Sequence, residues 1–258
     1  MSYFTYQEHQ SLAAGHGQRD DVHFQSAYNK LLELHNAVHP RLRNYNLDLH
    51  PRWQKASIIV HESAAALEPS SALVLPYFRS REQAEMVEGL MGKDQFLGGV
   101  DTYRHPVIEL RLMPDSFAIE LVLSRYAWWD QQNFIGKLEL PHHRTTFRQI
   151  LLEMDDDYRF GFWQGIELND MHLTTAEMRR GRILDEWMDT FADGKDWLRV
   201  GRWYEPESPA LHPSHLLAEV FETIKTLNKL YSFLLWTSNN NFQDFYERRQ
   251  QYSRRMYA

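Results

Sequence analysis

The stretch "HPVIELRLMPDSFAIELVLSR" at residues 105–125 decides the fold that this sequence predicts. Apolar and polar side chains alternate along both halves of the stretch, which is the period of a β-strand with one buried face. The residues Pro114-Asp115-Ser116 divide the two halves, and their composition is typical of a turn. The sequence therefore predicts a β-hairpin over about residues 107–125, with one buried face.

Further strands are predicted on both sides of this hairpin. Short β-branched, apolar or aromatic runs lie at 55–63, 71–78, 154–165 and 196–205. Pro76 weakens the second of these predictions, because proline cannot donate a hydrogen bond to a neighbouring strand.

Helical patterns separate the strands. Apolar residues recur at helical spacing within 20–39, 80–92, 126–154, 174–191 and 214–236. We expect Pro40 to end the first of these helices, since the residue before a proline is disfavoured in α geometry. Pro141 divides the third stretch into two helices.

The alternation of helices with an antiparallel hairpin predicts the α+β class. We expect a mixed or mainly antiparallel sheet, packed by several amphipathic helices. Residues 1–19 are rich in small and polar side chains without a sustained period, so they are predicted to form a loose N-terminal arm. Regular structure is expected from Asp20 or Asp21 onwards. Residues 20–258 show no linker and are predicted to form a single domain.

The composition excludes several classes of protein. The chain has no cysteine, which rules out disulfides, thiolate nucleophiles and cysteine-based zinc sites. Its start lacks the pattern of a secretory signal, and no run approaches the roughly eighteen apolar residues of a membrane span. We therefore expect a cytoplasmic protein with no membrane contact. The formal charge of −7 does not favour nucleic acid as a partner.

The strongest indication of a binding surface is "DWLRVGRWYE" at residues 196–205. On a regular strand, Trp197, Arg199 and Trp203 share one face, while Arg202 and Tyr204 lie on the other. A strand that buries Leu198 and Val200 is expected to expose the first set. Tryptophan rings around an arginine suit a planar or anionic ligand, through ring stacking and guanidinium hydrogen bonds. The alternative is that both faces are covered and the arginines pair with nearby acids.

His61 joins this candidate set because it follows the apolar run "SIIV" at residues 57–60, and residues at the end of a strand often reach a cleft. The predicted binding residues are Trp197, Arg199, Arg202, Trp203, Tyr204 and His61.

Catalytic patterns are incomplete. Asp101, Glu109 and Arg111 resemble a metal-dependent nuclease set, but arginine stands where lysine is usual. Alternating charges on a solvated sheet face explain the same residues. His35 and His39 share a helix face, yet a core histidine followed by one at the helix C-terminus accounts for them without a metal. No metal site is predicted.

We therefore expect a non-catalytic binding or protein-interaction domain that uses an arginine/aromatic surface, with a protein or a small planar or anionic molecule as its partner. The alternative is a metal-dependent hydrolase or nuclease whose site is assembled from distant Asp, Glu and His residues. The sequence leaves open whether the protein is an enzyme, which cofactor it takes and its oligomeric state.

Overall fold

The computed structural model describes residues 2–13, 21–52, 58–63, 70–91, 102–162, 172–180, 182–190 and 197–242. Within these residues the strands form one sheet, and every pairing between strands is antiparallel. The strands are β1 (His50–Pro51), β2 (Ile59–Ser63), β3 (Ser70–Phe78), β4 (Val107–Leu112), β5 (Phe117–Leu123), β6 (Arg159–Phe162), β7 (His172–Thr174) and β8 (Leu198–Tyr204). The order across the sheet is β1-β3-β4-β5-β8-β6-β7, and β2 also pairs with β3.

Helices follow most of the strands. They are α1 (Tyr6–Gln10), α2 (Val22–Asn44), α3 (Arg81–Met91), α4 (Trp128–Leu138), α5 (Pro141–Leu152), α6 (Thr175–Met178), α7 (Ile183–Thr190) and α8 (Pro213–Leu234), with short 3-10 turns at η2 (Thr102–Arg104) and η3 (Pro209–Leu211). This arrangement confirms the predicted α+β class. No helix of the described segments is both long and apolar enough to cross a membrane.

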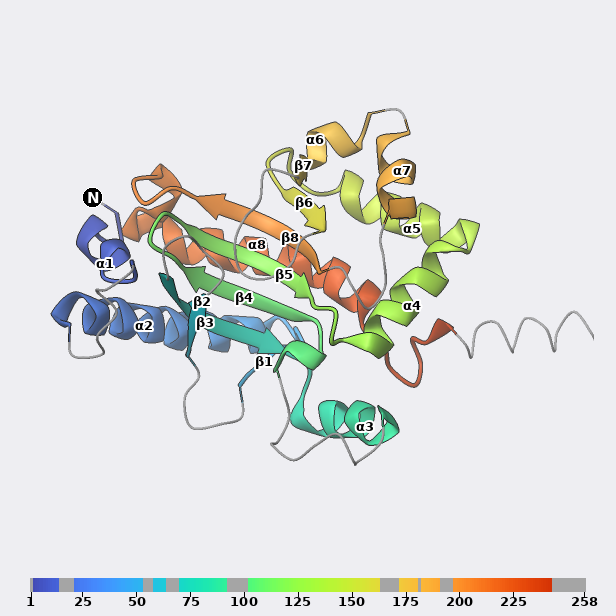
Figure 1. Ribbon diagram of the computed structural model, residues 1–258, viewed down its shortest axis with the longest axis horizontal. Helices are drawn as coiled ribbons and strands as arrows, with labels where there is room; N and C mark the ends of the chain where they lie inside the picture. The colour runs from blue at the N-terminus through green and yellow to red at the C-terminus, as the bar shows by residue number, and fades with distance from the viewer. Residues whose placement is uncertain are drawn as a thin grey trace, which may run out of the picture.

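The predicted hairpin is confirmed as β4 and β5, at the centre of the sheet. Its register places Leu110 opposite Ile119, and Glu109 directly opposite Glu120. Figure 1 shows α2 and α8 behind the strands, while α4 to α7 gather at one end of the molecule. Apolar side chains of the hairpin, such as Leu110, Ile119 and Leu121, belong to the main core together with apolar residues of α2 and α8.

The hairpin has two buried faces, which corrects the expectation of one. Every residue of β4 and β5 is buried, including Glu109, Arg111 and Glu120. The second face carries a small apolar cluster that includes Val74 and Ala118. Charged residues alternating along a strand therefore do not mark a solvated face here, because ion pairs compensate the buried charges.

Gly201 fixes how closely β8 approaches β5. Its register partner is Glu120, and a Cβ built at Gly201 falls 2.3 Å from the carbonyl oxygen of Ile119. Such a contact with backbone cannot be relieved by a side-chain rotation. Only glycine therefore fits this position without moving the strand.

We expect Gly201→Ala to lower the free energy of unfolding by about 1–3 kcal/mol, because the added methyl group overpacks the junction of β5 and β8. Gly89→Ala is the matched control, since a Cβ at Gly89 in α3 meets nothing within 4 Å. Helix propensity predicts a gain of up to about 1 kcal/mol for that control. Urea denaturation of both variants checks the prediction, and equal midpoints would contradict it.

Pro40 does not end the first long helix, contrary to expectation. Helix α2 continues through it to Asn44. Pro40 lies on the exposed side of the helix, while Val38 and Leu42 on either side are fully buried. Packing of these side chains outweighs the loss of one backbone hydrogen bond at the proline.

Regular structure begins earlier than Asp20 or Asp21. Residues 2–13 of the expected N-terminal arm include α1, which opens with a capping box of Thr5 and Glu8. Phe4 and Leu12 are fully buried, and the Phe4 ring lies 5.4 Å from that of Phe117 in β5. Residues 14–20 lie outside the described part of the chain.

The structure also differs from the predictions made for residues 174–191 and for Pro76. The predicted helix over 174–191 contains α6, with the expected Thr174–Glu177 capping box, and a separate α7. Pro76 lies inside β3. Along one edge, β3 pairs with β2 as far as Val74 and with β1 from Tyr77 onwards. Position 76 falls between these two pairings, so the missing N–H of the proline is tolerated there.

Candidate functional site

The residues predicted on β8 divide between two faces of the sheet, as the alternation requires. Arg199 lies on the face that carries Glu120, whereas Leu198 and Val200 lie in the main core. The expected exposure of the first set is not found for Arg199, which is 1% exposed. Trp197 and Trp203 are half-buried.

Arg199 belongs to a buried group of four charges, which we call the charge quartet: Glu109, Arg111, Glu120 and Arg199. Arg199 donates two hydrogen bonds to the Glu120 carboxylate, with its Nε 2.6 Å from Oε2. The Nε of Arg111 donates to Glu109 at 2.9 Å and lies 3.2 Å from Glu120 Oε1. Two glutamates on adjacent strands are thus held together by two arginines.

The charge quartet is electrically neutral when both carboxyls are ionised. Burial raises the pKa of Glu109, the charge of Arg111 opposes that rise, and the charge of Glu120 adds to it. The hydroxyl of Tyr103 donates a further hydrogen bond to Glu109 at 3.1 Å. This pairing satisfies the carboxylates within the fold and gives the quartet a clear structural role.

Arg202 and Tyr204 lie on the opposite face from Arg199. The Arg202 guanidinium pairs with Asp155, Asp157 and Glu219, at distances of 2.8, 2.6 and 2.7 Å. Tyr204 donates to the same Glu219 carboxylate. The two arginines of β8 therefore do not contribute to one site, and acidic groups surround each of them.

His61 is placed on a different part of the sheet from β8. Its backbone lies in β2, opposite Ala72 of β3, and the strands β4 and β5 stand between β3 and β8. In the nuclease-like set, Asp101 is outside the described residues and Glu109 pairs with Arg111. Among the residues described, no three His, Asp or Glu side chains are grouped so that they could hold a metal ion.

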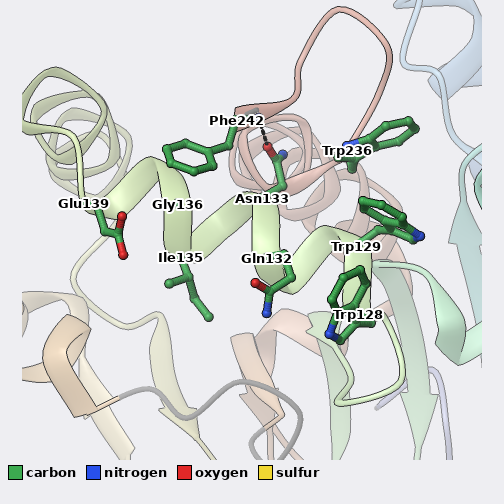
Figure 2. A pocket seen from close by; sticks show the side chains of 9 residues that line it. All are labelled: Trp128, Trp129, Gln132, Asn133, Ile135, Gly136, Glu139, Trp236 and Phe242. Carbon is green, nitrogen blue, oxygen red and sulfur yellow. Dashed lines mark hydrogen bonds between the residues drawn. The ribbon is translucent and has the colours of Figure 1, made fainter. Parts of the chain in front are cut away.

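A pocket of about 170 Å³ lies between α4 and the segment that follows α8, and we call it the tryptophan pocket. The described residues that line it are Trp128, Trp129, Gln132, Asn133, Ile135, Gly136, Glu139, Trp236 and Phe242. Figure 2 shows the three indole rings together near the start of α4, with Phe242 and Glu139 toward the other end of that helix. Four of the nine lining residues are aromatic, and amide and carboxylate side chains lie among them.

Three polar residues of α4 hold in place the end of α8, from which the other wall of the pocket continues. Asp130, Asn133 and Lys137 occur at positions i, i+3 and i+7, so they share one face of the helix. Asn133 donates to the carbonyl of Leu234 at 3.0 Å, and Lys137 donates to that of Phe233 at 2.6 Å. Burial lowers the pKa of Lys137 to about 8, against the opposing effect of the Asp130 charge.

An ion pair binds the main chain of Trp236 from both sides. The Asp130 carboxylate accepts a hydrogen bond from the Trp236 N–H at 2.6 Å, and Arg79 donates to the Trp236 carbonyl at 3.1 Å. Arg79 and Asp130 also pair with each other, and both side chains are almost completely buried. The backbone that carries the Trp236 ring is therefore fixed relative to α4.

Gly136 allows Phe242 to form part of the pocket wall. A Cβ built on Gly136 falls 2.4 Å from two atoms of the Phe242 ring, so the ring rests directly on the helix backbone. Asn133 also accepts a hydrogen bond from the Phe242 N–H at 3.0 Å. A larger residue at position 136 has to displace the ring.

Sequence reasoning missed this pocket as a site. The helical pattern over 126–154 places Trp128, Ile135 and Leu138 on a common face, but it carries no information about Trp236. The signal available in the sequence is the adjacent pair Trp128-Trp129, and the structure shows that Trp128 is 46% exposed. Apolar side chains that are exposed as a contiguous patch are a feature of binding sites.

No protein-family model matches this chain, and no curated protein matches it significantly.

Proposed function

We propose that the protein is a non-catalytic binding protein and that the tryptophan pocket is its ligand site. The observation that carries this proposal is the meeting of four aromatic rings, from α4 and from the segment after α8, around one concave space. Ligand sites are typically concave, largely apolar and fitted with a few polar groups, and the amide of Gln132 and the carboxylate of Glu139 supply such groups here.

The anchoring of the walls supports the same proposal. Asp130, Asn133 and Arg79 use buried hydrogen bonds to fix backbone that carries pocket residues, rather than leaving the segment after α8 free to collapse onto α4. A site that is already formed loses less conformational freedom when a ligand binds. Burying polar groups for this purpose is costly unless they are paired. The Asn133 amide is paired on both sides, and Arg79 and Asp130 pair with each other, whereas Arg79 Nε and Asp130 Oδ2 find no partner among the described residues.

The arginine/aromatic surface of β8 remains a second place where a partner could bind, through Trp197 and Trp203. It ranks behind the pocket because Arg199 and Arg202 already have carboxylate partners, so a ligand has to compete for them. The metal-dependent hydrolase or nuclease stays the alternative that the sequence raises, and no observation on the described residues favours it.

We expect at least one of three small probes, benzyl alcohol, benzyltrimethylammonium or benzoate, to bind in the pocket with an affinity that ligand-observed NMR detects. Trp236→Ala is expected to weaken this binding at least about tenfold, because it removes one aromatic wall while the main-chain hydrogen bonds of residue 236 remain. Gly136→Ala is expected to weaken it too, since the added methyl displaces the Phe242 ring.

Tyr45→Ala is the control, because Tyr45 is an exposed ring that does not line the pocket. A loss of binding in Trp197→Ala but not in Trp236→Ala would move the site to β8. Binding of no probe, or binding that neither pocket variant changes, would also overturn the proposal.

A further inference from the structure

Among the described residues that line the tryptophan pocket, the formal charge is negative. Among the described lining residues Glu139 alone carries a formal charge, and its exposed carboxylate has no ion-pair partner in the described segments. Lys137, the nearest cation on α4, donates instead to the carbonyl of Phe233 and to Asn240. Arg79 is likewise held by Asp130. A positively charged ligand in the pocket is therefore attracted by the carboxylate of Glu139 at the other end of α4.

The rings are arranged to present several faces to one space. The centroids of Trp128 and Trp129 are 4.9 Å apart with planes at 76°, and those of Trp129 and Trp236 are 5.7 Å apart with planes at 45°. Rings inclined in this way turn their faces in different directions rather than forming a flat platform, and all three line the pocket. The face of an indole ring carries negative potential, so the ring faces that line the pocket attract a cation held against them.

The size of the pocket limits the group that enters it. A cavity of about 150 Å³ is large enough for one benzene molecule, so a pocket of about 170 Å³ admits a group of similar size. A group of about five or six non-hydrogen atoms therefore fits, which corresponds to an alkylated ammonium centre with its methyl groups and one further carbon. A nucleotide base with its sugar is too large to enter completely.

We propose that the ligand of the tryptophan pocket is an organic cation of the alkylated or quaternary ammonium class, with its charged group among Trp128, Trp129 and Trp236 and with Glu139 providing long-range attraction. This proposal rests on the proposed function, because it names the class of ligand for the same pocket. Indole faces and a single carboxylate recognise positive charge without a directed hydrogen bond, which an ammonium with no N–H requires.

The test compares choline with 3,3-dimethyl-1-butanol, which has the same shape but a carbon atom in place of the charged nitrogen. Isothermal titration calorimetry on the full chain is expected to show choline binding at least about tenfold more tightly. Glu139→Gln is expected to weaken choline about two- to fivefold at low salt and to leave the neutral compound unchanged. Glu153→Gln, which removes an exposed charge away from the pocket, is the matched control.

Equal affinities for choline and its neutral isostere would overturn the cation proposal and leave the pocket as a site for neutral molecules. Binding of benzyl alcohol or benzoate without any binding of choline would overturn it in the same way. Failure of the proposed function is distinguishable, because then no probe of either experiment shows binding that depends on Trp236.

Discussion

Glu120→Gln is expected to lower the free energy of unfolding by about 3–5 kcal/mol. Glu120 accepts two hydrogen bonds from Arg199 and also lies 3.2 Å from Arg111, and all three side chains are at most 1% exposed. Glutamine keeps the shape of the side chain but removes its charge. The charge quartet is then left with two guanidinium groups and one carboxylate in a site that water does not reach.

Urea denaturation measures this loss, and Glu153→Gln is its control. Glu153 pairs with Lys229 on the surface, where both side chains are more than half exposed, so its charge contributes little to stability. A second experiment replaces both partners of the ion pair in one double variant, Glu120→Leu with Arg199→Leu. We expect the double variant to lose less stability than Glu120→Gln, because no unpaired charge stays buried. A loss below about 1 kcal/mol for Glu120→Gln would contradict the account of the charge quartet.

Asp130→Asn is expected to have an effect of similar size, about 3–5 kcal/mol, because it leaves the buried guanidinium of Arg79 without a counter-charge. It should also weaken the binding of a pocket ligand. Asp130 accepts the N–H of Trp236, and the Arg79–Asp130 pair fixes that residue's main chain beside α4. Loss of stability and loss of binding are thus expected together.

The measurements are urea denaturation and calorimetric titration of the same variant, at a temperature where it stays folded. Asp189→Asn is the control, since Asp189 pairs with Arg144 on the surface and is 69% exposed. A variant that loses stability but binds the pocket ligand as tightly as the unmodified protein would show that the ion pair supports the fold without shaping the pocket.

The elements of the fold were largely predictable where a local pattern coincided with the final structure. The alternation over 107–125 identified β4 and β5, and Pro141 separated α4 from α5. The capping residues at Ser80 and Thr174 correctly marked helix starts. Local signals failed where burial outweighed them: α2 continues through Pro40 because its apolar stripe packs on both sides of the proline.

The candidate sites were less predictable, since they depend on contacts between distant segments. Alternation along β8 separated Arg199 from Arg202, but it gave no indication that Glu120 lies beside Arg199. The tryptophan pocket joins Trp129 to Trp236 and Phe242, which are more than a hundred positions away in the chain. Its anchoring residues Asp130 and Lys137 look like ordinary helix-surface polar residues in the sequence.

The sequence by itself determined the periods of the strands and helices, because side-chain spacing along one segment sets which residues share a face. It also determined that two arginines of β8 lie on opposite faces. Only the tertiary structure decided whether those faces are covered, since burial depends on which segments pack against them. It likewise decided that Glu139, Phe242 and the three indole rings line one pocket, because a pocket forms from surfaces that no single segment contains.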